Sequence, residues 1–264
     1  MIGLSLLLLT LMDVPPALEE RAKMPAATQA QAYLSGADIV AMAHEAAGGQ
    51  LFVRPGSLFL EGYNIIRTPD GGEIVWDRYA MWRVFSEAKD DAHQASGKVR
   101  IEAWTEGELS LLLAFDGRTT SNQDGPMTDQ SANTMWSNSF GYGAIRNALD
   151  EGWTQVRKTD RMIDGQLAYM VELTDRSRSK TLFGIRQSDA AIVYVGFQTP
   201  RGWHERRYSE FFEKPGLSWR QAGRVRLFYD GVKSNEAVWT DFRIGRSVDE
   251  SIFRVETPPK EPTF

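Results

Sequence analysis

The chain has 264 residues, a net charge of −5 and no cysteine. The length allows one large domain or two small ones, and the acidic balance argues against a nucleic-acid partner, because phosphate binding needs a basic surface. The lack of cysteine excludes disulfides, thiolate nucleophiles and cysteine-ligated zinc. The chain has only three histidines, so a multi-histidine metal site would use nearly all of them. We therefore expect no metal and no cofactor.

The N-terminal residues have the pattern of a secretory signal peptide. Ile2–Met12 is an apolar run rich in leucine, and Pro15, Pro16 and Ala17 follow it closely. Eleven residues are too few to span a bilayer but match the apolar core of a signal peptide, although no Lys or Arg precedes them. We expect a signal peptide over residues 1–17 and a polar leader over 18–34. A short buried helix or a membrane anchor is the alternative.

The clearest helix is predicted over Ser35–Gly49. Ser35 and Asp38 have the spacing of a capping box, with Asp in place of the usual Glu. Four apolar residues form one stripe at helical spacing: Ile39, Met42, Ala43 and Ala46. The Gly48-Gly49 pair ends the helix. Because His44 lies off the apolar stripe, we expect it to be solvated.

Glu73–Phe115 organises the rest of the chain. After a first strand at Ser57–Ile66, three long strands are expected here, over Ile74–Phe85, Lys98–Thr105 and Glu108–Phe115, because apolar residues recur with a period of two. The first of the three has Ile74, Trp76, Ala80, Trp82 and Val84 on one face and Val75, Asp77, Tyr79, Met81, Arg83 and Phe85 on the other. Arg78 and Arg83 interrupt these faces. One could meet a ligand head group, and a buried ion pair is the equal alternative.

The second half of the chain continues as strands. Thr119–Asn138 is predicted to be a long surface loop, and Ser139–Gly152 a second helix. Strands are expected at Trp153–Asp160, Leu167–Leu173, Thr181–Arg186, Ala191–Gln198, Trp203–Phe212, Ala222–Tyr229 and Ala237–Ile244, and a helical turn at Val248–Phe253. Asp-Gly pairs between such runs mark hairpins. About ten strands and two helices, without crossover helices between strands, predict a single-domain α+β fold with one large, twisted antiparallel sheet.

Catalytic motifs are weak. His204 and Glu205 begin like a zinc-protease motif, but Tyr208 stands where the second histidine belongs. Glu205 and Glu210 could act as an acid–base pair in a hydrolase. An exposed edge strand defended by charge explains the charged Trp203–Phe212 run more simply. We therefore expect a protein that is not an enzyme, with a hydrolase using His204, Glu205 or Glu210 as the rival hypothesis.

The apolar strand surface exceeds what two helices can cover. Such a surplus predicts either a lined cavity for a ligand or a surface that docks a partner. Tryptophan suits both, because it has a large apolar body and one N–H donor, and the chain has eight. The candidate cavity residues are Trp76, Arg78, Trp82, Trp104, Leu111, Leu113, Tyr169 and Trp239.

The order of these features resembles a known family. A helix with the sequence Asp38-Ile-Val-Ala-Met-Ala-His-Glu-Ala-Ala-Gly-Gly49 leads into a long meander, a helical insert follows, and the chain closes with Val248-Asp-Glu-Ser-Ile-Phe253-Arg-Val-Glu-Thr-Pro258. Over Ser35–Pro258 this resembles the outer-membrane lipoprotein-sorting superfamily, with its LolA/LolB-like half-barrel.

The resemblance implies an unclosed β-barrel covered by two or three helices, over a domain of residues 35–258. Independently of it, Pro258, Pro259 and Pro262 predict an extended tail at 259–264. It implies an apolar cavity that holds a lipid or lipoprotein acyl chain. It also implies a non-enzymatic carrier or receptor in the bacterial periplasm, where an envelope protein is a possible partner. No functional residue is carried over from the family by motif.

Overall fold

The computed structural model describes residues 34–86, 97–129, 133, 136, 141–245 and 247–255. The chain divides into two units, Met1–Leu34 and Ser35–Phe264, and every element below belongs to the second. The expected signal peptide, the leader apart from Leu34, and the C-terminal tail lie outside the described residues.

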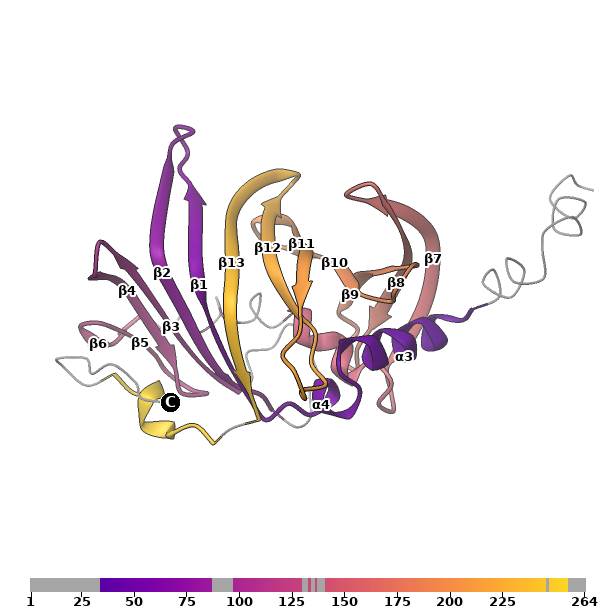
Figure 1. Ribbon diagram of the computed structural model, residues 1–264, viewed down its shortest axis with the longest axis horizontal. Helices are drawn as coiled ribbons and strands as arrows, with labels where there is room; N and C mark the ends of the chain where they lie inside the picture. Colours follow the sequence, from indigo (N-terminus) through magenta and orange to yellow (C-terminus); the bar gives the residue numbers. More distant parts are fainter. Residues whose placement is uncertain are drawn as a thin grey trace, which may run out of the picture. The chain divides into compact units, whose positions relative to one another are not determined.

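One antiparallel sheet forms the body of this unit (Figure 1). Its first six strands are β1 (Ser57–Arg67), β2 (Glu73–Val84), β3 (Lys98–Thr105), β4 (Glu108–Phe115), β5 (Thr120–Asn122) and β6 (Gly125–Pro126). The other seven are β7 (Thr154–Ile163), β8 (Gln166–Thr174), β9 (Lys180–Arg186), β10 (Ile192–Thr199), β11 (Gly202–Phe212), β12 (Gln221–Tyr229) and β13 (Val232–Ile244). The α+β prediction with a large antiparallel sheet is confirmed, with thirteen strands instead of about ten.

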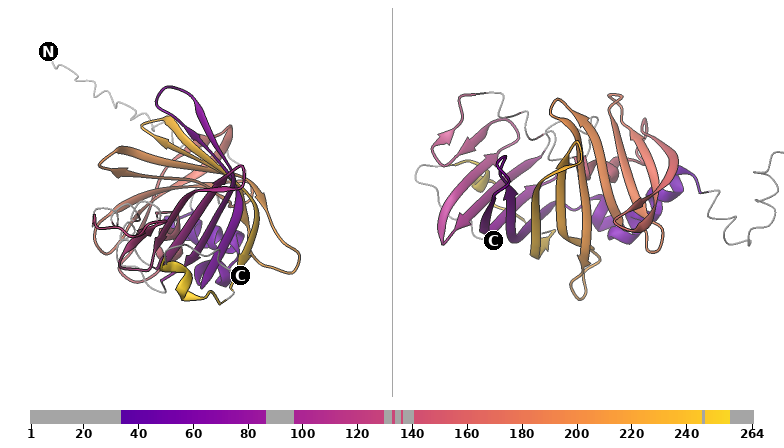
Figure 2. Two further views of the ribbon diagram at one scale, coloured as in Figure 1. Left: turned by 90° about the vertical axis from the view of Figure 1, so that its left-hand side faces the viewer. Right: turned by 90° about the horizontal axis from the view of Figure 1, so that it is seen from above.

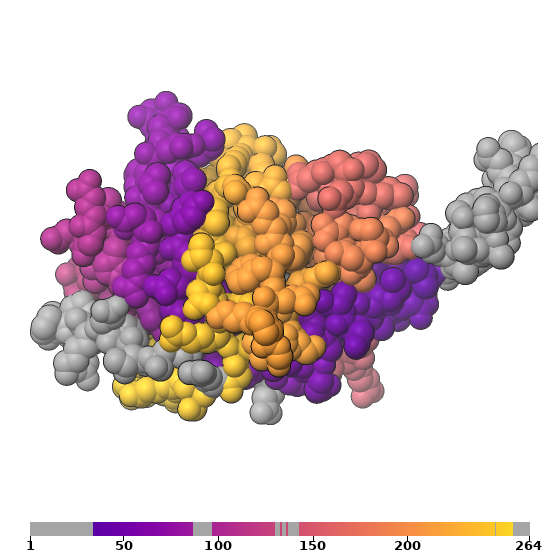
Figure 3. Space-filling view, in the orientation of Figure 1, coloured from indigo at the N-terminus to yellow at the C-terminus, as the bar shows by residue number. Residues whose placement is uncertain are grey.

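Neighbouring strands in the sheet are mostly neighbours in sequence. The order is β6-β5-β4-β3-β2-β1-β13-β12-β11-β10-β9-β8-β7, so among the described strands β1 with β13 is the one pairing that joins distant parts of the chain. The bands of colour across Figure 3 follow this order from β2 through β1 and β13 to β12. In the described part of the chain β6 and β7 end the sheet without pairing to each other, so the curved sheet is unclosed, as the resemblance implies.

Tight turns explain the hairpins. Asp164 and Gly165 have φ of 48° and 77°, and Asp230 and Gly231 have 48° and 80°. Positive φ at both central residues is the two-residue turn whose twist matches that of paired strands, and Asp-Gly adopts it readily. The predicted hairpins at these two pairs are confirmed by the pairing of β7 with β8 and of β12 with β13.

A bulge at Gly62 shifts the alternation of β2. Gly62 pairs with Tyr79 and Asn64 pairs with Trp76, so two steps along β1 match three along β2. A Cβ at Gly62 would lie 1.8 Å from the carbonyl oxygen of Val238, so the strands approach here only because the residue is glycine. The extra residue turns Trp76 to the face that carries Tyr79, and the two rings stack at 5.9 Å.

The two faces of the sheet differ in their cover. The face that carries Tyr79, Met81 and Arg83, here called the cavity face, borders the cavity described below. On the opposite, outer face, Phe59, Ala80 and Trp82 pack with Phe253 of η2, a 3₁₀ helix over Glu250–Phe253. The helical turn predicted at Val248–Phe253 is thereby confirmed.

Helix α3 (Gly36–Ala47) contacts the β7–β8 end of the sheet (Figure 2). Its capping box is complete, because the Ser35 hydroxyl accepts from the amide of Asp38 and the Asp38 carboxylate accepts from that of Ser35. The prediction of a solvated His44 is wrong. The residue is only 8% exposed, and its Nε2 donates to the carbonyl oxygen of Ile145 at 2.7 Å.

The middle of the chain also differs from expectation. The predicted loop over Thr119–Asn138 contains β5, β6 and the buried Trp136. In place of a helix over Ser139–Gly152, the structure has η1, a 3₁₀ helix over Gly141–Asn147. The sequence did not indicate the short helix α4 (Gln50–Val53) that follows α3.

Candidate ligand-binding cavity

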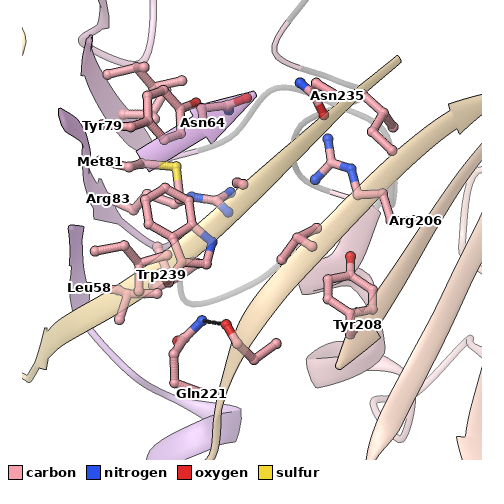
Figure 4. A pocket seen from close by; sticks show the side chains of 18 of the residues that line it. Leu58, Asn64, Tyr79, Met81, Arg83, Arg206, Tyr208, Gln221, Asn235 and Trp239 are labelled. Carbon is pink, nitrogen blue, oxygen red and sulfur yellow. Dashed lines mark hydrogen bonds between the residues drawn. The ribbon is translucent and has the colours of Figure 1, made fainter. Parts of the chain in front are cut away.

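A cavity of about 180 Å³ lies on the cavity face of the sheet (Figure 4). Strands β1–β3 line one side and β11–β13 line the other. Trp136, Arg146 of η1 and the Trp219-Arg220 segment before β12 complete the lining. The cavity therefore lies at the long-range junction of the sheet where β1 meets β13.

Apolar side chains dominate the lining. The strands contribute Leu58, Leu60, Met81, Val225, Leu227 and Ala237, among others. Their positions follow from register: Leu60 pairs with Met81, and Val225 with Ala237, so directly opposed residues point to one side. Such a concave apolar surface with a few polar groups is the usual form of a small-molecule site.

Aromatic rings form two parts of the lining. Trp239 of β13 stacks on Tyr79 of β2 at 5.2 Å between ring centroids. Trp136 stacks on Phe115 at 6.1 Å, and its indole N–H donates to the Thr120 hydroxyl at 2.9 Å. This hydrogen bond satisfies the one polar atom of Trp136, so the ring can be fully buried beside the cavity.

Tyrosines add polar groups that remain neutral. Burial raises the pKa of Tyr79 to about 12, and burial likewise raises the pKa of Tyr208 to about 12. Both phenols are therefore protonated at neutral pH. Asn64, which is only 3% exposed, presents an amide oxygen with no hydrogen-bond partner among the described residues.

Arginines are the only charged residues among the described residues of the lining: Arg83, Arg146, Arg206 and Arg220. Arg220 is neutralised by Asp189 at 3.1 Å and by Glu213 at 3.3 Å. Arg206 donates from Nε to Nε2 of His204 at 3.0 Å, and this acceptor ring carries no negative charge. The lining is thus apolar and positively charged.

Three of the eight candidate residues lie on the outer face. Arg78 pairs with Glu61 at 2.8 Å and stacks over Trp104 at 4.1 Å. Trp82 packs against Phe59 and Phe253. For Arg78 the structure gives the ion-pair alternative, whereas Arg83 faces the cavity.

The other five candidates lie on the cavity face. Trp239 lines the cavity, and Trp76 stacks on Tyr79, which lines it. Leu113, like Met81, packs against the cluster that contains Trp136, and the register places Leu111 on the same side of β4. Tyr169 is buried on β8, in the other half of the sheet.

The charged strand Trp203–Phe212 was misjudged. It forms β11, which lies between β10 and β12, so the prediction of an edge strand is wrong. Its alternation puts Arg206 and Tyr208 into the cavity, whereas Glu205 and Arg207 pair with each other at 2.6 Å on the outer face. The spacing of Arg206 and Tyr208 was the signal that could have identified this contribution.

The residues of the rival hydrolase hypothesis do not assemble. His204 is 1% exposed and stacks on Phe197 at 4.6 Å, on the opposite face from Glu205. Glu210 pairs with Arg224 at 2.7 Å. Within the described residues, no group of three or more His, Asp or Glu side chains could hold a metal ion.

Comparison with solved structures identifies the architecture. A LolA superfamily protein from Nitrosomonas europaea matches 83% of this chain and 97% of its own, with a TM-score of 0.51 and 16% identity. The chain has the LolA fold. A putative outer membrane lipoprotein-sorting protein domain from Vibrio parahaemolyticus and a DUF1329 family protein from Desulfovibrio piger each match 83% of the chain, with 12% identity and a TM-score of 0.49. They are covered to 97% and 95% of their lengths.

At the level of sequence, no protein-family model and no curated protein matches the chain. The LolA fold is therefore a structural likeness, and the function must be argued from the cavity. None of the described helices is long and apolar enough to cross a bilayer.

Proposed function

We propose that the chain is a non-enzymatic binding or carrier protein that holds a hydrophobic ligand, such as a lipid or a lipoprotein acyl chain, in this cavity. The observation that supports the proposal is the cavity of about 180 Å³ with a mostly apolar lining on the concave part of a LolA-like sheet. An apolar cavity of about 150 Å³ is enough for a benzene-sized ligand. The volume therefore suits one apolar segment better than several chains at once.

A probe-binding experiment tests this proposal. The full chain is titrated with N-phenyl-1-naphthylamine, whose fluorescence rises in apolar surroundings, and a fatty acid is then added to displace it. Val225→Trp fills the cavity from β12, and we expect it to weaken probe binding at least tenfold. Val232→Trp is the matched control, because Val232 is 71% exposed. Equal probe binding by both variants and the wild type would contradict ligand binding in this cavity.

We further propose that residues 1–17 are a cleaved signal peptide, that 18–34 are a leader, and that the domain of residues 35–258 acts in the periplasm. The apolar run at Ile2–Met12 supports the proposal. A carrier must also hand over its ligand, so an envelope protein is the expected partner. N-terminal sequencing of protein from a periplasmic fraction tests the first point, and an intact Met1 in the cytoplasmic fraction would contradict it.

A further inference from the structure

Three arginines from separate elements meet at the cavity. Arg83 comes from β2, Arg206 from β11 and Arg146 from η1. Figure 4 shows Arg83 and Arg206 extending into the cavity from opposite walls. The fourth arginine of the lining, Arg220, is paired with Asp189, and the described lining residues include no Asp or Glu.

Two of these arginines are shielded from water. Arg83 and Arg146 are each 8% exposed. Their guanidinium carbons lie 5.0 and 3.9 Å from the centroid of the Phe85 ring, so both cations contact the same aromatic side chain. Ring contacts stabilise a cation but leave its charge in place.

The positive charges of Arg146 and Arg206 act on Arg83. Burial, together with the charges of Arg146 and Arg206, lowers the pKa of Arg83 to about 9. Arg83 still carries its proton at pH 7. An anion bound between these arginines would raise the pKa of Arg83 again, because an opposite charge favours the protonated guanidinium.

We propose that the ligand is an amphiphile with one alkyl chain and an anionic head group, a carboxylate or a phosphate, which Arg83 and Arg206 bind with support from Arg146. Guanidinium groups suit these anions because their planar N–H donors match two oxygens at once. The part of the alkyl chain next to the head group would lie along Leu58, Leu60, Val225 and Leu227. This inference rests on the proposed carrier function and specifies its ligand class.

Binding of matched twelve-carbon probes below their micelle concentrations tests the proposal. Dodecanoate and dodecyl phosphate carry the anion, dodecanol is neutral, dodecyltrimethylammonium is cationic, and inorganic phosphate lacks the chain. We expect calorimetry on the full chain at pH 7 to give both anionic amphiphiles roughly 10- to 100-fold higher affinity than dodecanol, the range of a charge-assisted hydrogen bond. Inorganic phosphate should bind far more weakly than dodecyl phosphate.

Variants locate the effect. Arg83→Met and Arg206→Met should each lower dodecanoate affinity about tenfold and change dodecanol affinity much less, so that the ratio of the two affinities falls. Arg78→Met is the control, because Arg78 lies on the outer face, and it should bind dodecanoate as the wild type does. Circular dichroism checks that each variant is folded, and Arg206→Lys, which keeps the charge, should retain part of the preference for anions.

The outcomes separate this inference from the carrier function. If dodecanol binds as tightly as dodecanoate and the arginine variants bind both alike, the carrier function stands and the anionic head group is wrong. If inorganic phosphate binds as tightly as dodecyl phosphate, the site binds a free anion and the amphiphile is wrong. If no alkyl probe binds, the carrier function fails as well.

Discussion

Replacing Arg83 by methionine should stabilise the protein, although the residue is buried. Methionine keeps an unbranched apolar side chain of similar reach and removes the charge. Burial and two neighbouring arginines disfavour that charge. A residue that lowers the stability of the ligand-free fold is expected where binding requires it.

The magnitude follows from the pKa of Arg83. One pKa unit is worth about 1.36 kcal/mol, so the fall of the Arg83 pKa from its ordinary value to about 9 corresponds to roughly 4 to 5 kcal/mol against the charged form. The variant also loses the ring contact with Phe85 and the hydrogen bonds of the guanidinium, each worth about 1 kcal/mol. We expect a net gain of about 1 to 3 kcal/mol, which raises the melting temperature by roughly 2 to 10 °C in a domain of this size.

Urea and thermal unfolding of the wild type, Arg83→Met and Arg78→Met give the comparison. Arg78 lies on the same strand, but its side chain is 39% exposed and paired with Glu61, so its loss should cost about 1 kcal/mol or less. Dodecanoate should then raise the melting temperature of the wild type more than that of Arg83→Met. A clear loss of stability in Arg83→Met, similar to or larger than that in Arg78→Met, would refute the reasoning.

Three further predictions concern the scaffold. Burial lowers the pKa of His44 below its ordinary value, so the unfolded chain binds the extra proton first, and the free energy of unfolding should be full above about pH 6.5 and fall as the pH drops below that value. The urea midpoints of His44→Gln should lack this dependence on pH. An unchanged pH dependence in the variant would contradict the assignment to His44. Glu102→Leu removes the partner of Arg100, which lies at 2.6 Å, and leaves the buried arginine charge uncompensated by this carboxylate. The variant should lose about 3 to 5 kcal/mol of unfolding free energy in urea, and the double variant with Arg100→Met should recover most of that loss. A double variant whose loss equals the sum of the two single losses would contradict this. Trp136→Ala should cost about 3 to 5 kcal/mol and admit bulkier probes into the cavity, whereas a cost below about 1 kcal/mol would mean that the indole is not packed as described.

Local features of the fold were accessible from the sequence. Alternation of apolar residues predicted β3 and β4, and Ser35 with Asp38 predicted the start of α3. Two Asp-Gly pairs predicted the β7–β8 and β12–β13 hairpins. Each of these depends on residues close together in the chain, where periodicity and turn chemistry act directly.

The placement of the site was not accessible in the same way. Alternation separates two faces of a strand but does not say which one is concave, and the bulge at Gly62 moves Trp76 to the face of Tyr79. Arg206 reaches the cavity because β11 is an inner strand, which depends on pairing along the whole sheet. His44 is buried against Ile145, and Trp136 against Thr120. Neither contact can be predicted from the residues next to it in the sequence.

The most direct test of ligand binding in the cavity is quenching of tryptophan fluorescence by a fatty acid that is brominated along its alkyl chain. Trp136, Trp219 and Trp239 line the cavity, whereas Trp82 and Trp104 lie on the outer face. If the chain occupies the cavity, quenching of the full-length protein should be saturable and should fall in Trp239→Phe but not in Trp104→Phe. Quenching that does not saturate, or that falls equally in both variants, would contradict a ligand held in this cavity.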